Sequence, residues 1–182
     1  MNALAKDEVG KFFKANFVAS HQKIGNFTID GSQKQGGNVA SYFCTADGRV
    51  LHVVAGPVSA DTLLKEARWV VETWKAAQLV THEADQPLRN FMHNAHAARL
   101  RNEHKLDLHK PGNAMPGGGL PSGTHANTVP IYDQPRFGKL DRAGRVHLLL
   151  AASPLIPIER LYAVVFEKVL DERVSILPVD KK

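Results

Sequence analysis

One cysteine and nine histidines are the residues of this chain best suited to nucleophilic or metal chemistry. Cys44 is the single cysteine, so no disulfide can form within the chain. A free cysteine usually behaves as a small buried hydrophobe. To act as a reactive thiol, Cys44 would need a nearby cation to lower its pKa, and His52 is the candidate across a predicted hairpin. We expect a buried thiol, with a catalytic thiol as the alternative.

Two further histidines, His93 and His96, are spaced i, i+3 on a predicted helix, with Glu103 and His104 two turns further on. Imidazole nitrogens and carboxylate oxygens are zinc ligands, and a zinc site needs three or four of them. His96 and Glu103 are about 10 Å apart along a helix axis, so one ion would need ligands from other segments. We expect a solvated polar face and keep His93 and His96 as candidate metal ligands.

Other motifs of catalysis are missing from the sequence. The glycine run at residues 117–119 lacks the Gly-Lys-Ser/Thr ending of a phosphate-binding loop and is typical of a linker. The sequence also has no Gly-x-Ser-x-Gly nucleophile elbow. No cofactor is therefore expected.

The elements that would position these residues begin with a β-hairpin. Two β-rich runs, Val39 to Cys44 and Val50 to Ala55, are separated by a short segment that contains Asp47-Gly48. Asp-Gly between two such runs is one of the strongest hairpin signals. The sequence therefore predicts two antiparallel strands.

A long helix is predicted to follow the hairpin directly. Gly56 and Pro57 end the second strand, and Ser59 is a candidate N-cap with Asp61 in the first turn. Apolar residues at helical spacing then continue to Leu79. The pattern predicts an amphipathic helix over about Ala60 to Leu79.

This order of hairpin, glycine and capped helix resembles the closing half of a thioredoxin-like domain. Asp47-Gly48 matches the family's hairpin turn, and Gly56 matches the glycine before its last helix. Upstream, Asp7 to Val18 is similar to the short helix and strand that follow the redox helix in many members. The resemblance covers about the first 80 residues. It implies an α/β fold with a thioredoxin-like sheet, partial or variant, and flanking helices over residues 1–82.

The chain departs from the family at both catalytic hallmarks. The Cys-x-x-Cys pair should precede the first helix, but Met1 to Lys6 is all that stands there. The family's cis-proline position reads Asn38, Val39 and Ala40, which become candidate binding residues. Two explanations remain open. Either the domain has kept the scaffold without its redox site, or the redox segment lies upstream of Met1.

The middle of the chain changes in character. Residues 83–108 predict a histidine- and arginine-rich helix from Pro87 to about Leu106. Residues 109–143 are rich in Pro, Gly, Ser, Thr and Asn and predict a long mobile loop or linker. We expect Tyr132 and Phe137 to anchor this loop on the rest of the protein.

The last segment, residues 144–182, is predicted to add a strand and a helix. Arg145 to Ala151 is a nearly continuous apolar run that indicates a buried strand, which would cover the exposed edge of the first sheet. Apolar residues at helical spacing predict a helix from Ile158 to about Glu172. The apolar face of this helix packs on the first module or forms a homo-oligomer contact.

Composition limits the classes of function. The 182 residues are 43% hydrophobic and 23% charged, which is typical of a soluble globular protein. The net charge is +5, but the basic residues are scattered, so no nucleic-acid partner is expected. No run approaches the roughly 20 apolar residues of a membrane span. The first residues lack the apolar core of a signal peptide, and the compartment stays open.

Three functions are carried forward from the sequence. The first is a non-catalytic scaffold or interaction module that binds a protein partner. The second is a thiol-disulfide oxidoreductase whose Cys-x-x-Cys segment lies upstream of this chain. The third is a metal-binding protein that uses His93 and His96.

Overall fold

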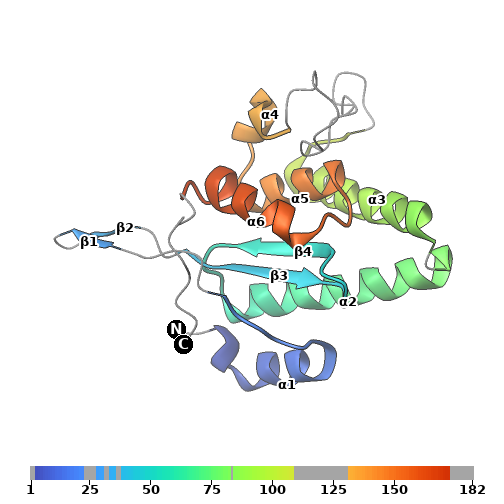
Figure 1. The fold of residues 1–182 in the computed structure, drawn as a ribbon, viewed down its shortest axis with the longest axis horizontal. Coiled ribbons are helices and arrows are strands. Elements are labelled where there is room, and N and C mark those ends of the chain that lie inside the picture. The colour runs from blue at the N-terminus through green and yellow to red at the C-terminus, as the bar shows by residue number, and fades with distance from the viewer. Residues whose placement is uncertain are drawn as a thin grey trace.

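The computed structural model describes residues 3–22, 28–30, 33–35, 38–82, 84–108 and 131–172, and these form a mixed α/β, mostly helical structure (Figure 1). The strands are β1 (Thr28–Asp30), β2 (Gln33–Gln35), β3 (Ala40–Cys44) and β4 (Val50–Ala55). The helices are α1 (Asp7–Asn16), α2 (Ala60–Thr81), α3 (Asp85–His104), α4 (Pro135–Gly138), α5 (Arg142–Ala152) and α6 (Ile158–Val164). Two 3-10 turns, Ala3–Ala5 and Ile131–Asp133, and a π-helical turn, Val165–Val169, complete the list.

The predicted hairpin is confirmed as β3 and β4, which pair antiparallel. Gly48 has a φ of +80°, a left-handed conformation that glycine adopts without steric cost. The amide of Gly48 donates to the Thr45 carbonyl, which closes the turn. The Asp-Gly signal in the sequence therefore located the turn correctly.

The helix predicted after the hairpin is confirmed as α2. The side chain of Ser59 accepts a hydrogen bond from the backbone amide of Thr62, as an N-cap should. The helix ends at His82, whose φ of 48° is a left-handed C-cap conformation. The helix that follows, α3, covers most of the predicted range from Pro87 to Leu106.

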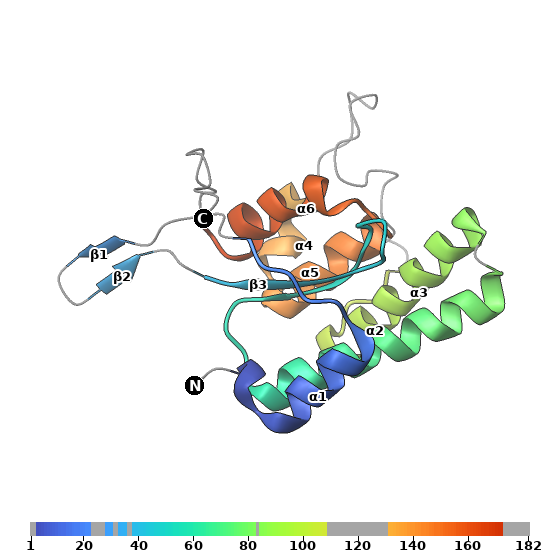
Figure 2. The same cartoon turned by 60° about the horizontal axis from the view of Figure 1, so that its bottom comes forward.

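The β3–β4 hairpin lies between two helical layers (Figures 1 and 2). Phe43 and Val54 belong to one apolar cluster, together with residues of α1 and α2. Val50 and Val53 belong to a second cluster, together with residues of α5 and α6. Side chains from α3 enter both clusters, so this helix closes one side of the layered core.

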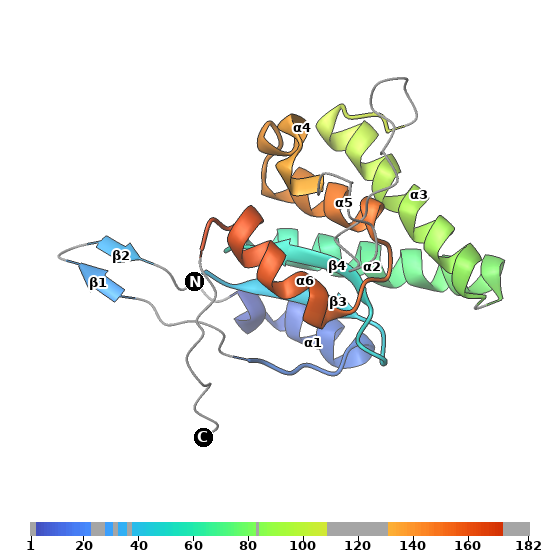
Figure 3. The same ribbon diagram turned by 45° about the horizontal axis from the view of Figure 1, so that its top comes forward.

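The strand predicted over Arg145 to Ala151 is wrong, because this segment lies within helix α5. The helix starts at an Asp141 N-cap, whose carboxylate accepts from the amide of Gly144 at 2.8 Å. It packs against α3 and β4 near the centre of the protein (Figure 3). A helix enclosed on several sides is apolar all round, and the resulting continuous apolar run resembles a buried strand.

The edge of β4 is covered by the segment after α5 instead. Arg49 and Pro157 form an isolated antiparallel bridge. The amide of Val50 donates to the Ile156 carbonyl at 2.8 Å, and that of Ile158 donates to the Gly48 carbonyl at 3.0 Å. The predicted C-terminal helix is present as α6, and its last part winds as the π-helical turn Val165–Val169.

Of the remaining predictions, some are confirmed and others are not. Helix α1 lies where a short helix was expected, but residues 17–22 form no strand. Phe17 instead packs its ring on Phe43, with the centroids 5.3 Å apart. Phe137 is buried and Tyr132 packs against the same cluster, whereas residues 109–130 of the predicted loop lie outside the described residues. In the described part of the chain, no helix has the length and hydrophobicity to cross a membrane.

Candidate metal centre

Three buried histidines meet inside the protein, and each comes from a different element. His52 lies on β4, His96 on α3 and His147 on α5. One nitrogen from each ring lies within 4.8 Å of the others, and the three residues are 3%, 1% and 1% exposed. We call these residues the histidine cluster. It joins parts of the chain that are far apart in sequence.

A β-bulge places His52 in the cluster. Phe43 pairs with His52 and Cys44 pairs with Val50, so Leu51 is an extra residue in β4. Because directly paired residues share a face, His52 lies on the same face as Phe43, and Leu51 packs in that cluster too. Bulges commonly redirect a side chain in this way. The rings of Phe43 and His52 stack, with centroids 6.3 Å apart and 15° between their planes.

The tautomer of His96 is fixed by the backbone at the bulge. His96 Nε2 lies 3.0 Å from the carbonyl oxygen of Leu51. A carbonyl can only accept, so Nε2 carries the proton and Nδ1 keeps its lone pair. Burial, followed by the nearby His52, lowers the pKa of His96 to about 3. His96 is therefore neutral at pH 7 and has a free electron pair on Nδ1.

The tautomer of His52 is fixed by a carboxylate. His52 Nε2 lies 3.3 Å from Glu66 Oε2. Burial raises the pKa of Glu66, but the close contacts with His52 and Arg99 outweigh it and lower the value to about 2. Glu66 is therefore an ionised acceptor that keeps the proton of His52 on Nε2. His52 Nδ1 is enclosed and has no hydrogen-bond partner among the described residues.

Arg99 holds Glu66 in place. Its guanidinium lies 2.9 Å from Glu66 Oε1 and 2.7 Å from Glu103 Oε1. It also lies over the ring of Trp69, 4.9 Å from the centroid. Glu66 is thus oriented toward His52 by a charged partner that is itself paired, as in the outer shell of many metal sites.

His147 differs from the other two histidines. Its Nδ1 lies 2.8 Å from Nδ1 of His96. Since His96 Nδ1 has a lone pair, the proton of this hydrogen bond belongs to His147 Nδ1. Burial, with His52 and His96 nearby, lowers the pKa of His147 well below its usual value. His147 is also neutral, with its proton on Nδ1.

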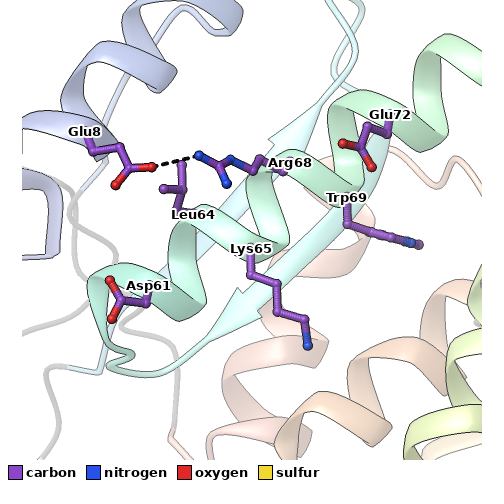
Figure 4. Close-up of a pocket in the computed structure, with 7 residues that line it drawn as sticks. All are labelled: Glu8, Asp61, Leu64, Lys65, Arg68, Trp69 and Glu72. Carbon is purple, nitrogen blue, oxygen red and sulfur yellow. Dashed lines mark hydrogen bonds and ion pairs between the residues drawn. The ribbon is translucent and has the colours of Figure 1, made fainter.

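Trp69 lies between the histidine cluster and the surface. Its ring meets those of His52, His96 and His147 at steep angles, with centroids 5.2, 5.3 and 5.8 Å away. Trp69 also lines a surface pocket of about 520 Å³ on α2 (Figure 4). The other lining residues are Glu8, Asp61, Leu64, Lys65, Arg68 and Glu72. Trp69 is therefore placed to report events in the cluster.

The candidate residues from the sequence are mostly elsewhere. His96 lies in the cluster, but His93 Nδ1 donates to the carbonyl of Ala151 at 2.8 Å and takes no part in it. Cys44 packs in the cluster of Val50 and Val53, on the opposite face of the hairpin from His52. Burial, and then Glu159, raises the pKa of the Cys44 thiol to about 11. The thiol is protonated at neutral pH.

The candidate binding residues at the start of β3 do not reach the cluster. The amide and side chain of Asn38 both bond to Glu172, at 3.1 and 2.7 Å. Val39 is 56% exposed and accepts from the amide of Gly56 at 2.7 Å. Ala40 is the first residue of β3. Asn38 therefore ties the start of β3 to Glu172, and Val39 ties it to the end of β4.

Sequence reasoning missed His147 and gave His52 a different role. The cluster members are separated by 44 and 51 residues, so no local spacing connects them. Comparison with protein families, with curated proteins and with solved structures found no match to this chain. The geometry of the histidine cluster is therefore the feature that points to a function.

Proposed function

We propose that this protein binds a divalent transition-metal ion, zinc first among them, through His52, His96 and His147. The observation that carries the proposal is the enclosed Nδ1 of His52, which has no hydrogen-bond partner in the described chain, in a residue with one ring nitrogen within 4.8 Å of nitrogens of His96 and His147. An unsatisfied buried polar atom costs about 1–3 kcal/mol. A metal ion bound to these nitrogens would remove that cost.

The ligand set favours particular metals. Imidazole suits zinc, copper, iron and nickel, whereas magnesium and calcium prefer oxygen ligands. Three protein ligands also leave a fourth position for water or a substrate, as in catalytic zinc sites. The two ligand nitrogens of a pair of imidazoles on one tetrahedral zinc lie about 3.3 Å apart. The rings of His96 and His147, with Nδ1 atoms 2.8 Å apart, must therefore separate by about half an ångström.

Metal titration followed by Trp69 fluorescence tests the proposal. In a Trp74→Phe background Trp69 is the only tryptophan, and Co²⁺ bound beside it should quench its emission. We expect zinc to reverse the quenching by competition. Zinc at 100 times its Kd should also stabilise the fold by about 2.7 kcal/mol. This stabilisation is measured as a rise in Tm.

Single substitutions identify the ligands. His96→Ala and His147→Ala should each weaken zinc binding by roughly 100-fold or more, because two imidazoles hold zinc far less well than three. His93→Gln is the matched control, since it changes a histidine one turn away on α3 and keeps a donor for the Ala151 carbonyl. Equal zinc affinity in His96→Ala, His93→Gln and the wild type would disprove the proposal.

For the fold, we propose that β3, β4 and α2 are the closing part of a variant thioredoxin-like domain. The order of hairpin, Gly56 and capped helix supports this, as does the packing of α2 on one face of the hairpin. In the described chain, the added pairing to this hairpin is the single bridge between Arg49 and Pro157. An experimental structure with a central strand beside β3 would strengthen the relationship.

A protein-interaction role is the second candidate function. Leu79 and Val80, at the end of α2, are large apolar side chains that are 76% and 64% exposed. Sedimentation equilibrium tests whether a second copy of the chain covers them. The oxidoreductase alternative, with its dithiol upstream of Met1, is tested by the intact mass of the protein from its native source.

A further inference from the structure

One of the three proposed ligands, His147, is protonated on the nitrogen that would bind the metal. Zinc needs a lone pair on the nitrogen of each histidine that points toward the ion. The carbonyl of Leu51 and the carboxylate of Glu66 leave that lone pair on Nδ1 of His96 and His52. His147 instead carries a proton on the Nδ1 that faces His96. A metal ion can bind this Nδ1 only after the proton has moved.

His104 lies beside His147 and has an unused acceptor. The two ring centroids are 6.1 Å apart. His104 Nδ1 lies 3.2 Å from Asp141 Oδ1, so the carboxylate favours the proton on Nδ1. His104 Nε2 is therefore the nitrogen with the lone pair. It is enclosed and has no hydrogen-bond partner among the described residues.

Both neighbours of His104 are fixed by helix α5. Asp141 is the N-cap of α5 and also accepts from the amide of Gly144 at 2.8 Å. A Cβ on Gly144 would lie 3.0 Å from His104 Nδ1, so the missing side chain lets the imidazole lie against the helix. Gly144 is one turn before His147 on α5. The same helix thus positions the carboxylate, the space for His104 and the third ligand.

We propose that His104, held by Asp141, is a positioning residue that sets the metal-binding tautomer of His147. This inference depends on the metal site proposed above. When the metal binds His147 Nδ1, the N–H bond there breaks and one forms at Nε2, so His147 remains neutral. His104 Nε2 has no hydrogen-bond partner in this structure, and it accepts the new N–H once the rings of His104 and His147, now with centroids 6.1 Å apart, move closer together. Asp141, His104 and His147 then repeat the outer-shell arrangement that Arg99, Glu66 and His52 already show.

Nitrogen-15 NMR of the imidazoles in the full chain tests the tautomer directly. In the metal-free protein we expect His147 to carry its proton on Nδ1, and in the zinc-loaded protein on Nε2. A purely structural role for His104, joining the end of α3 to the start of α5, would not require this change. A zinc-loaded His147 that still carries its proton on Nδ1 would overturn the inference.

Substitutions at His104 measure the effect on affinity. His104→Phe keeps a ring but removes the acceptor, and we expect zinc affinity to fall by about 10- to 100-fold, as for other outer-shell partners. His104→Gln restores an acceptor and should recover most of the affinity. It also serves as the folded reference if the phenylalanine variant does not fold. Asp141→Asn keeps an N-cap but removes the carboxylate from His104, and should have a smaller effect.

The outcomes separate this inference from the proposed function. Wild-type affinity in His104→Phe, together with its loss in His96→Ala, would overturn the role of His104 alone. No zinc binding by the wild-type chain would overturn both proposals. Loss of zinc affinity in both His104→Phe and His96→Ala, with recovery in His104→Gln, supports both the metal site and the role of His104.

Discussion

Two groups of aromatic rings meet at Phe43, and they are stabilised in different ways. The rings of Phe13 and Phe17 pack on Phe43, with centroids 6.0 and 5.3 Å from that of Phe43, in a cluster of apolar residues. His52 also stacks on Phe43, and leads to His96 and His147. The phenylalanines need only contact, whereas every imidazole nitrogen needs a partner or remains unsatisfied.

This difference indicates which region serves function. Well-packed apolar residues usually replace buried polar groups with little or no loss of stability. Three neutral histidines in the interior are therefore not required to hold the hairpin against its helices, since apolar contacts with α1 and α2 on one face and with α5 and α6 on the other do that. A local conflict with the rules of core packing is expected at functional sites. The histidine cluster is such a conflict.

Low pH should give the largest difference between the two groups of rings, because it destabilises the histidine cluster and not the phenylalanines. The pKa values of His52, His96 and His147 are lowered, to about 3 for His96, so below pH 6.5 the unfolded chain binds more protons than the folded one. Their contribution is complete above pH 6.5 and is lost as the pH falls toward the folded values. We expect the free energy of unfolding of metal-free protein to fall by roughly 1 kcal/mol per pH unit for each histidine.

Urea denaturation at several pH values measures this loss. Glu66, with a pKa lowered from 4.5 to about 2, also loses its contribution in acid, but only as the pH falls below 4.5. The interval from pH 6.5 to 4.5 therefore reports on the histidines. A free energy of unfolding that stays constant across this interval would show that the cluster is not held neutral.

A cavity in the apolar cluster around Phe43 should have the next largest effect on the free energy of unfolding. Leu63 on α2 is 4% exposed and belongs to the cluster of Phe43. We expect Leu63→Ala to lower the free energy of unfolding by about 2–5 kcal/mol, and to leave the shape of its pH dependence unchanged. Zinc affinity of the folded variant should stay within about twofold of the wild type. If zinc affinity falls as far as in His96→Ala, the two clusters are not independent.

The smallest effect should come from the cap of α2, which supports both clusters. Ser59 Oγ accepts from the amide of Thr62 at 3.1 Å. Ser59→Ala should cost about 1 kcal/mol of stability, measured by thermal or urea unfolding, and Ser59→Asp should restore it. A clear loss of zinc affinity in Ser59→Ala would mean that the start of α2 controls the position of Glu66.

Local signals in the sequence predicted the hairpin and α2 well. Asp47-Gly48 and Ser59 act on their immediate neighbours, so their effects can be read from the sequence. Helix α5 was mistaken for a strand because its apolar run is continuous. The signal against a strand was Asp141, a capping residue just before the run, which is typical of a helix start.

The metal centre could not be predicted in the same way. The i, i+3 spacing of His93 and His96 suggested a pair, but they have different partners: the carbonyl of Ala151 for His93, and Leu51 and His147 for His96. His147 lies on α5, the segment that was predicted as a strand. The position of His52 depends on a bulge that no residue type in β4 announces. Tertiary packing, not local pattern, assembles the cluster.

The bulge at Leu51 makes the protein more sensitive to insertions and deletions than to substitutions in this strand. Loss of Leu51 would restore regular pairing between β3 and β4 and remove the carbonyl that accepts from His96. Many different side chains at position 51 would leave the number of residues before His52, and therefore the bulge, unchanged. Among related sequences, a constant number of residues between the Asp47-Gly48 turn and His52 would therefore identify the site better than the identity of the residues between them.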